Sequence, residues 1–400
     1  MAHRTQALTA LGSLALLNVG ALHAQSGGTG SAEFTLEEVV VTAQKREETL
    51  QKAALSIVAL DGDALRENGK NNLVDILRNV AGVETGNGYF YVRGIGSAPQ
   101  FGQDASVTVS VNGVFMQNAQ TQRDAFYDIA RVEVARGPQT TLTGRTSEGG
   151  AVNVIANEPS TAKLELKGTL EGGDHALVAG QGVINVPLGS KVALRVAGAG
   201  VQRNDGFFTA GNGAVDNKSG RVRLLVQPAD AFKMVLSMDR SVGRIHGSQG
   251  GNSGRIDLSQ PLTTVSGYYW NPTPPLSEQL YTISNWFGDF TWQTGIGTLY
   301  FQPTYQSNRN ITYPGFATNS VNLFNNLALG YNYDAAIARS TTSNSQVSTQ
   351  DSRSYELRLS NPAGSKLTWL VGAFYFKGNQ AIALQNGVAG TTVPNNATAN

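Results

Sequence analysis

The sequence predicts a mainly β protein, in which an N-terminal α+β domain precedes an antiparallel transmembrane β-barrel. Glycine is abundant, with 46 residues in 400, and short apolar runs alternate with polar residues, as is typical of many strands and turns. Beyond Pro159, apolar and polar residues alternate with a two-residue period, whereas the segment before it shows both helical and strand periods. After the first two dozen residues no run of about 20 apolar residues could form a transmembrane helix. A closed barrel of strands is the other architecture that crosses a membrane.

Residues 1–24 have the features of an export signal. His3 and Arg4 form a basic start, and an apolar stretch runs from Ala7 to Leu17 before a small-residue end at Ala24. As a membrane anchor the apolar stretch would be too short to span about 30 Å of hydrocarbon. We therefore expect cleavage after Ala24.

Residues 25–48 are expected to form a flexible leader that carries a β-prone peptide. Gln25–Ser31 is rich in Gly and Ser, and Glu38–Ala43 contains consecutive valines before the charged Gln44–Glu48. Consecutive β-branched residues favour an extended chain that can add to another sheet as a strand. The peptide could equally be an ordinary strand of the domain that follows.

Residues 49–158 are expected to form a small α+β domain. Apolar residues at helical spacing predict a helix over Asn72–Asn79, and short strands are predicted at Tyr89–Arg93 and Ser106–Val111.

Residues 159–400 are expected to form strands with one apolar and one polar face. Val222 and Leu224 alternate with Arg221 and Arg223, and the same period recurs around Glu356. A barrel with a wet lumen and a lipid-facing exterior requires this alternation. A soluble β-sandwich would show the same period with its apolar face buried, so alternation alone does not decide between them.

Connection lengths and the export signal favour the barrel. Tight turns at Gln227–Asp230 and Asn361–Gly364 alternate with long connections at about 243–278 and 308–350. Outer-membrane barrels place short turns in the periplasm and long loops outside the cell.

Catalysis and nucleic-acid binding are not expected. The chain has no cysteine and a formal net charge of +1. His175 and His246 lie in turn-like or loop settings without metal-ligand spacing, and the glycines of Gly62–Lys70 are wrongly spaced for a phosphate loop. We therefore expect no enzyme, no cofactor and no metal site.

The segment Val132–Gln139, together with Gly149–Ile155, resembles the plug signature of TonB-dependent outer-membrane receptors. Val132–Gln139 begins the signature and Gly149–Ile155 follows its final strand, with Thr140 where the family usually has glycine. Tyr91–Gly96 is similar to the arginine–glycine strand end, and Asn112-Gly113 resembles the family's aspartate–glycine turn.

The resemblance implies active uptake of a scarce nutrient across the bacterial outer membrane. We expect a monomer in outer-membrane lipid, powered by the TonB energy-coupling protein, with a ferric siderophore as ligand and cobalamin or a carbohydrate as alternatives. A passive porin-like channel would share the barrel but would lack the plug signature and the peptide at Glu38–Ala43. The family barrel has 22 strands, and residues 162–400 would build about half of it, so we expect the sequence to be an N-terminal fragment.

The resemblance also assigns roles to particular residues. Residues that would contact TonB form the family's TonB box: Glu38, Val39, Val40, Val41, Thr42 and Ala43. Residues that would lock the plug to the barrel are Arg93, Arg136 and Glu356, although Glu356 could equally be a solvated charge of the lumen. Residues at the plug apices that would face the substrate, or merely cover the plug, are Asn87, Tyr89, Gln100, Phe101, Phe115 and Gln117.

Overall fold

The fold was examined in a computed structural model. It describes residues 40–41, 45, 48–49, 56–68, 72–86, 89–97, 105–116, 126–140, 144, 146–203, 214–246, 278–313, 342–362, 365 and 367–388. The predicted export signal lies outside these residues. Among the residues described, no helix is long and apolar enough to span a membrane.

Two short helices of the N-terminal domain begin at polar caps. Helix α1 (Gly62–Glu67) starts after Asp61, whose carboxylate accepts a hydrogen bond from the Ala64 amide at 2.8 Å. Helix α2 (Leu73–Leu77) starts after Asn72, which accepts from the Asp75 amide at 2.9 Å. Side-chain caps satisfy amides that have no partner within the helix. The helix predicted over Asn72–Asn79 is thus confirmed, with a shorter span.

The strands of this domain form three sheets. The five-stranded sheet has the order β3-β9-β10-β7-β8, and β7 and β10 pair in parallel. Its strands are β3 (Ser56–Asp61), β7 (Val107–Val111), β8 (Val114–Phe115), β9 (Ile129–Arg136) and β10 (Gly150–Ala156). The smaller sheets contain β1 (Val40–Val41) with β2 (Glu48–Thr49), and β4 (Val83–Gly86) with β5 (Tyr89–Val92) and β6 (Ile95–Gly96).

Two tight turns of this domain use left-handed backbone. Asn112 and Gly113 have φ of 51° and 81° between β7 and β8, and Arg93 and Gly94 have φ of 52° and 80° between β5 and β6. Positive φ at both central residues is the geometry of two-residue hairpins. The turn expected at Asn112-Gly113 is therefore confirmed, and its backbone is left-handed.

Apolar residues from both helices and from the five-stranded sheet form one core. Leu73 and Leu77 of α2 meet Val107 of β7 and both Val132 and Val134 of β9, and all five are almost completely buried. Because β9 is covered on both faces, even the Glu133 side chain between these valines is buried and binds Arg131 Nε at 2.8 Å.

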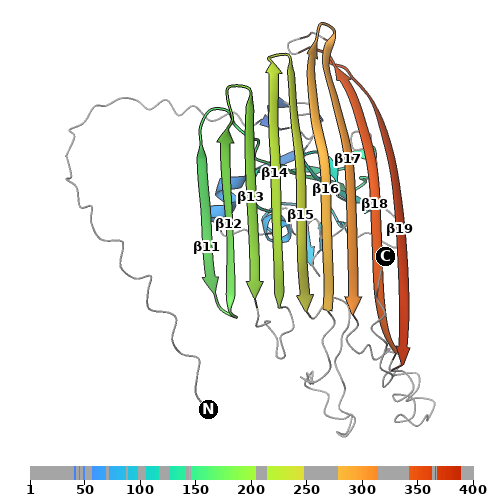
Figure 1. The fold of residues 1–400 in the computed structure, drawn as a ribbon. Coiled ribbons are helices and arrows are strands. Elements are labelled where there is room, and N and C mark those ends of the chain that lie inside the picture. The colour runs from blue at the N-terminus through green and yellow to red at the C-terminus, as the bar shows by residue number, and fades with distance from the viewer. Residues whose placement is uncertain are drawn as a thin grey trace, which may run out of the picture. The chain divides into compact units, whose positions relative to one another are not determined.

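After this domain in the chain, nine strands pair in sequence order to form one antiparallel sheet (Figure 1). The strands are β11 (Glu165–Gly173), β12 (Leu177–Pro187), β13 (Val192–Arg203), β14 (Val215–Ala229), β15 (Phe232–His246), β16 (Glu278–Thr294), β17 (Gly297–Tyr313), β18 (Thr342–Ser360) and β19 (Leu370–Val388). Short connections such as residues 230–231 alternate with longer ones such as 247–277 and 314–341. This alternation agrees with the arrangement expected from the sequence.

Burial in the sheet is inverted relative to a soluble protein. Arg221 and Arg223 are 3% and 2% exposed, whereas Val222 and Leu236 on the opposite face are 43% and 40% exposed. A β-sandwich would bury the apolar face. The exposed apolar face excludes the sandwich and is the arrangement of a membrane barrel wall.

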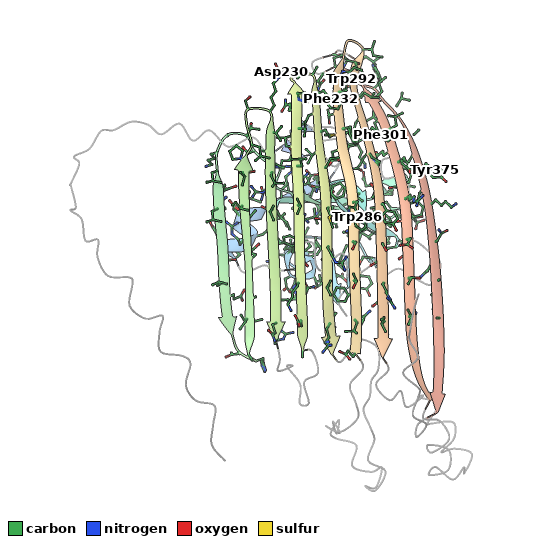
Figure 2. The ribbon with its side chains drawn as sticks, in the orientation of Figure 1. Asp230, Phe232, Trp286, Trp292, Phe301 and Tyr375 are labelled. Atoms are coloured by element: carbon green, nitrogen blue, oxygen red, sulfur yellow. The ribbon has the colours of Figure 1, made fainter. Side chains whose placement is uncertain are left out.

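Aromatic side chains cluster on this exposed face. Trp286 and Tyr305 have ring centroids 5.5 Å apart, and Phe290 and Phe301 lie 6.0 Å apart. Figure 2 shows Trp292 near the short-turn end of the sheet and Trp286 further toward the long-connection end. Aromatic rows of this kind flank the apolar band of outer-membrane barrels.

We predict that Leu236→Arg, in the middle of the apolar band, destabilises the folded sheet in membranes by about 2–4 kcal/mol. Val242→Arg, on the same face of the same strand but closer to the long connection, is the matched control and should cost about 0–1 kcal/mol. The folded fraction is measured from the heat-dependent shift in gel mobility. Equal losses in both variants would contradict a hydrocarbon environment for this face.

Candidate functional site

The candidate site is the contact between the inner, polar face of the sheet and the N-terminal domain. Inward-facing residues of β13–β18 include long polar side chains that reach residues of that domain. These contacts form three groups, at residues 127–128 and 156–157, at the β7–β8 turn, and at Lys45.

The first group centres on the Asp128 carboxylate. Arg195 of β13 donates to it twice, from Nε at 2.7 Å and from Nη2 at 2.6 Å. Arg195 also donates to Glu165 of β11 at 2.8 Å, and Asn157 donates to Asp128 at 2.9 Å. The Arg195 and Asp128 side chains are 5% and 4% exposed. A buried, bidentate pair of this kind gives geometric specificity as well as attraction.

The Asp128 backbone is held in an uncommon conformation. Its φ is 54°, in the left-handed region that costs most residues about 1–2 kcal/mol and that Asp tolerates better than most. The residue lies directly before β9, and its carbonyl oxygen accepts from the Asn157 amide directly after β10. Asp128 thereby joins the start of one central strand to the end of the other.

Two further arginines bind backbone carbonyl groups at the same strand ends. Arg221 of β14 donates to the Tyr127 carbonyl at 3.1 Å and lies 4.7 Å from the centroid of the Tyr127 ring, while Asp239 of β15 accepts from its Nε. Arg223 donates to the carbonyl oxygens of Ala156 and Asn157 at 3.1 and 2.8 Å. The N–H groups of both guanidinium groups therefore donate to backbone carbonyl oxygens where β9 begins and β10 ends.

The second group holds the β7–β8 turn. Gln302 of β17 donates to the Asn112 carbonyl at 2.9 Å and to Asp289 of β16 at 2.7 Å. Gln306, four residues further along β17, donates to the Phe115 carbonyl at 2.7 Å. Two inward amides of one strand thus bind the turn and the second arm of the hairpin.

The third group is an ion pair at Lys45. Lys45 Nζ lies 3.0 Å from Glu356 Oε2 of β18, and Arg358 Nη1 donates to the Lys45 carbonyl at 3.0 Å. Arg358 Nε lies 3.2 Å from the other Glu356 oxygen. Burial lowers the pKa of Lys45 below its ordinary value, and the Glu356 carboxylate opposes that shift.

The structure places the predicted lock residues differently from the expected pairing. Among the described residues, the ion-pair partners of Glu356 are Lys45 and Arg358 rather than Arg93 or Arg136. Arg136 Nη1 instead donates to the Ala81 carbonyl at 3.0 Å, within the N-terminal domain. Arg93 is exposed in its turn, where its backbone is left-handed. A role for these residues in locking stays a prediction.

The remaining predicted residues are only partly described. Val40 and Val41 form strand β1, which pairs antiparallel with Thr49 and Glu48. The rest of the predicted TonB box lies outside the described residues: Glu38, Val39, Thr42 and Ala43. Of the predicted apices, Phe115 belongs to strand β8, and Tyr89 begins β5. The other apices, Asn87, Gln100, Phe101 and Gln117, also lie outside the described residues.

Sequence reasoning missed the Asp128 group. Alternation did place Arg221 and Arg223 on the polar face, but nothing in the sequence links them to Tyr127 or Asn157. Asp128 and Arg195 are 67 residues apart, and only the fold brings them together.

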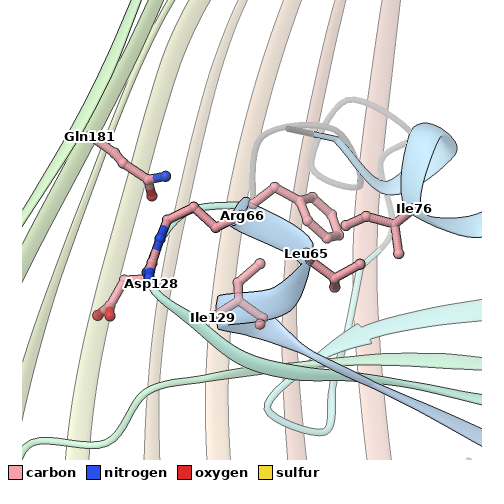
Figure 3. Close-up of a pocket in the computed structure, with 8 residues that line it drawn as sticks. Leu65, Arg66, Ile76, Asp128, Ile129 and Gln181 are labelled. Carbon is pink, nitrogen blue, oxygen red and sulfur yellow. The ribbon is translucent and has the colours of Figure 1, made fainter. Parts of the chain in front are cut away.

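A small cavity lies beside this group (Figure 3). Leu65 and Arg66 of α1, Ile76 of α2 and Ile129 of β9 line it together with Asp128, and Gln181 of β12 faces it from the sheet. Figure 3 shows Gln181 and Arg66 on the Asp128 side of the cavity. The described part of the chain holds no cluster of metal-ligating residues.

Comparison with known proteins relates both parts of the chain to outer-membrane receptors. Residues 49–151 match the family model of the TonB-dependent Receptor Plug Domain. The Pesticin receptor of Yersinia pestis is 30% identical over 147 residues, which are 35% of this chain and 21% of that receptor. The Ferric enterobactin receptor of Pseudomonas aeruginosa is 27% identical over 239 residues, or 51% of this chain and 30% of that receptor.

Solved structures show the same fold. The ferric yersiniabactin uptake receptor FyuA from Yersinia pestis superposes with a TM-score of 0.63 at 16% identity, over 84% of this chain and 50% of that one. The alcaligin outer-membrane receptor FauA from Bordetella pertussis gives 0.60 at 13% identity, over 87% and 51%. The chain thus spans about half the length of these solved receptors. Residues 49–151 are thus similar to the plug domain of TonB-dependent receptors, and strands β11–β19 share the fold of part of the barrel wall in these solved receptors.

Proposed function

We propose that this chain acts in TonB-dependent uptake of a ferric siderophore across the bacterial outer membrane. The observation that carries the proposal is the plug domain, bound to the polar inner face of a membrane sheet by buried ion pairs and hydrogen bonds. The names of the relatives support the ligand class, since one is a receptor for ferric enterobactin and another takes up ferric yersiniabactin. A passive channel would not need a domain held in this way.

The proposed work is mechanical, because no catalytic group is required. The long connections and plug apices would capture the ligand, and TonB would pull on the peptide at Glu38–Ala43. Energy would come from the inner-membrane potential, which is worth about 2.3 kcal/mol per charge per 100 mV. The plug would then rearrange and admit the ligand to the periplasm.

The order of contacts along the chain suggests how the pull would act. Lys45 lies two residues after the proposed box and binds Glu356 and Arg358. Tension applied at the box reaches this ion pair before it reaches the strands of the plug. The Asp128 group lies more than 80 residues further along, where β9 and β10 are anchored. Lys45 would therefore be released first, while the Asp128 group retains the plug.

We predict that Val40→Pro abolishes uptake of radiolabelled ferric siderophore by cells that carry the whole receptor gene, because proline cannot donate its share of hydrogen bonds to an added strand. Gly28→Pro, in the leader ahead of the box, is the matched control and should transport normally. Cobalamin and a carbohydrate, tested in parallel, identify the ligand class. Uptake that persists in Val40→Pro would refute dependence on TonB.

Charge reversal should expose the role of Lys45. We expect Glu356→Lys to place three cations together, to release the leader and to make the plug more sensitive to protease by at least about five-fold. The control, Asp230→Lys, makes the same charge change in an exposed turn at the end of β14 and should leave cleavage unchanged. Equal cleavage rates in wild type and Glu356→Lys would contradict a locking role for this pair.

A double-mutant cycle tests the Asp128 anchor. Asp128→Asn removes the negative charge that the buried Arg195 guanidinium binds. It should lower the free energy of plug opening, measured by hydrogen exchange in β9 and β10, by about 3–5 kcal/mol. Combining it with Arg195→Met should cost less than the sum of the single changes by about 0.5–3 kcal/mol. Additive effects would show that the pair is not coupled.

A further inference from the structure

The outer face of the sheet carries a row of cations that neither the plug nor the proposed transport step uses. Arg240 of β15, Arg309 of β17, Arg353 of β18 and Lys377 of β19 all have exposed side chains. On each strand, they lie an even number of positions from the lipid-facing residues. They therefore lie on the same face and point away from the plug. We call these four residues the cationic row.

The cationic row lies at one border of the apolar band. Trp286, Tyr305 and Arg353 are neighbours in register, so the row begins where the aromatic residues end. Ser284, in register with Arg240, is eight residues from Trp292, about 27 Å along the strand at about 3.4 Å per residue. With the usual tilt of about 35–45° this is about 19–22 Å of height, slightly less than an apolar band about 25 Å tall. The row therefore lies at headgroup depth on the long-connection side.

Neighbouring acids do not neutralise the row. On the same face, Glu278 lies 2.8 Å from Arg244 and Asp216 lies 3.6 Å from Lys218, both nearer the long connections. Within the described residues, by contrast, the four members of the row make no ion pair. One acid, Asp351, lies among them and accepts from the Tyr305 hydroxyl at 3.5 Å.

Two members of the row face each other as like charges. Arg353 and Lys377 are direct partners in the register of β18 and β19. Like charges at directly opposed positions destabilise a strand pair. An anion between the two side chains would relieve this repulsion.

The remaining neighbours are suited to phosphate. Ser307, which lies in register beside Asp351, is partly exposed and can supply a hydroxyl donor. Arginine is the preferred side chain for phosphate oxygens because its fork of donors matches their geometry. The row extends over five adjacent strands, about 19 Å at about 4.8 Å per strand, which is wider than a single phosphate.

We propose that the cationic row binds the headgroup of a lipid with more than one phosphate, in the outer leaflet of the outer membrane. The apolar band directly beside the row would contact the acyl chains of the same lipid. The choice of leaflet rests on the proposed function, which orients the long connections toward the outside. Binding itself follows from the surface alone.

The test compares a variant of the row with a matched control. The whole receptor, purified in a nonionic detergent, is titrated with diphosphorylated lipid A, with its dephosphorylated form and with inorganic phosphate, and bound species are counted by native mass spectrometry. The variant is Arg353→Gln with Lys377→Gln. The control, Lys163→Gln with Lys191→Gln, removes two exposed cations from the short-turn end of the sheet.

Wild type and control should bind diphosphorylated lipid A at least about ten-fold more tightly than the dephosphorylated form, and the variant should lose about ten-fold or more, as expected for two cations near a charged headgroup. Arg353→Lys keeps the charge and should retain most of the binding. Equal affinity of variant and control would overturn the proposal. Displacement of the lipid by inorganic phosphate at low millimolar concentration would show a site for free anions and would also overturn it. Neither TonB nor transport enters this measurement, so its failure leaves the uptake proposal standing.

Discussion

The structure depends on the hydrogen bonds that polar side chains on the inner face of the sheet make with the strand ends of the plug. Arg221 and Arg223 are almost completely buried, and each donates to backbone carbonyl groups next to β9 or β10. A buried guanidinium without partners costs several kcal/mol, and a buried carbonyl without a donor also costs free energy. Each surface therefore supplies what the other needs, and neither would be stable in this form alone.

This constraint explains why both faces of the sheet depart from those of a soluble protein. On the inner face, polar side chains are buried because they meet the plug. On the outer face, side chains such as Leu236 and Trp292 are exposed because hydrocarbon replaces water as their surroundings. The two-residue period of a strand lets one segment meet both demands.

The plug contacts differ in where they attach along the chain. Lys45 binds the sheet close to the proposed box, through one ion pair and one backbone hydrogen bond. Asp128 binds it through a bidentate pair, in a backbone conformation that the surrounding hydrogen bonds hold in place. The pull proposed above would therefore reach the contact of Lys45 before it reaches that of Asp128.

Sequence alone determined the class of the fold and most of its local structure. The strand period around Arg221, the turn at Asn112-Gly113, the helix after Asn72 and the plug signature at Val132–Gln139 depend on neighbours close in the chain, and local backbone and side-chain preferences therefore predict them. The resemblance to TonB-dependent outer-membrane receptors followed from the same residues.

Tertiary structure alone decided the partners and the buried face. Strand period is the same in a sandwich and a barrel, so the period could not show which face is buried, whereas the burial of Arg223 and the exposure of Val222 did. Glu356 was recognised as an inward charge, yet its partner proved to be Lys45, because ion pairing depends on which side chains the fold brings within about 4 Å. Asp128 and Arg195 lie far apart in the chain, and no pattern along the sequence records a contact that only the closed arrangement of plug and sheet creates.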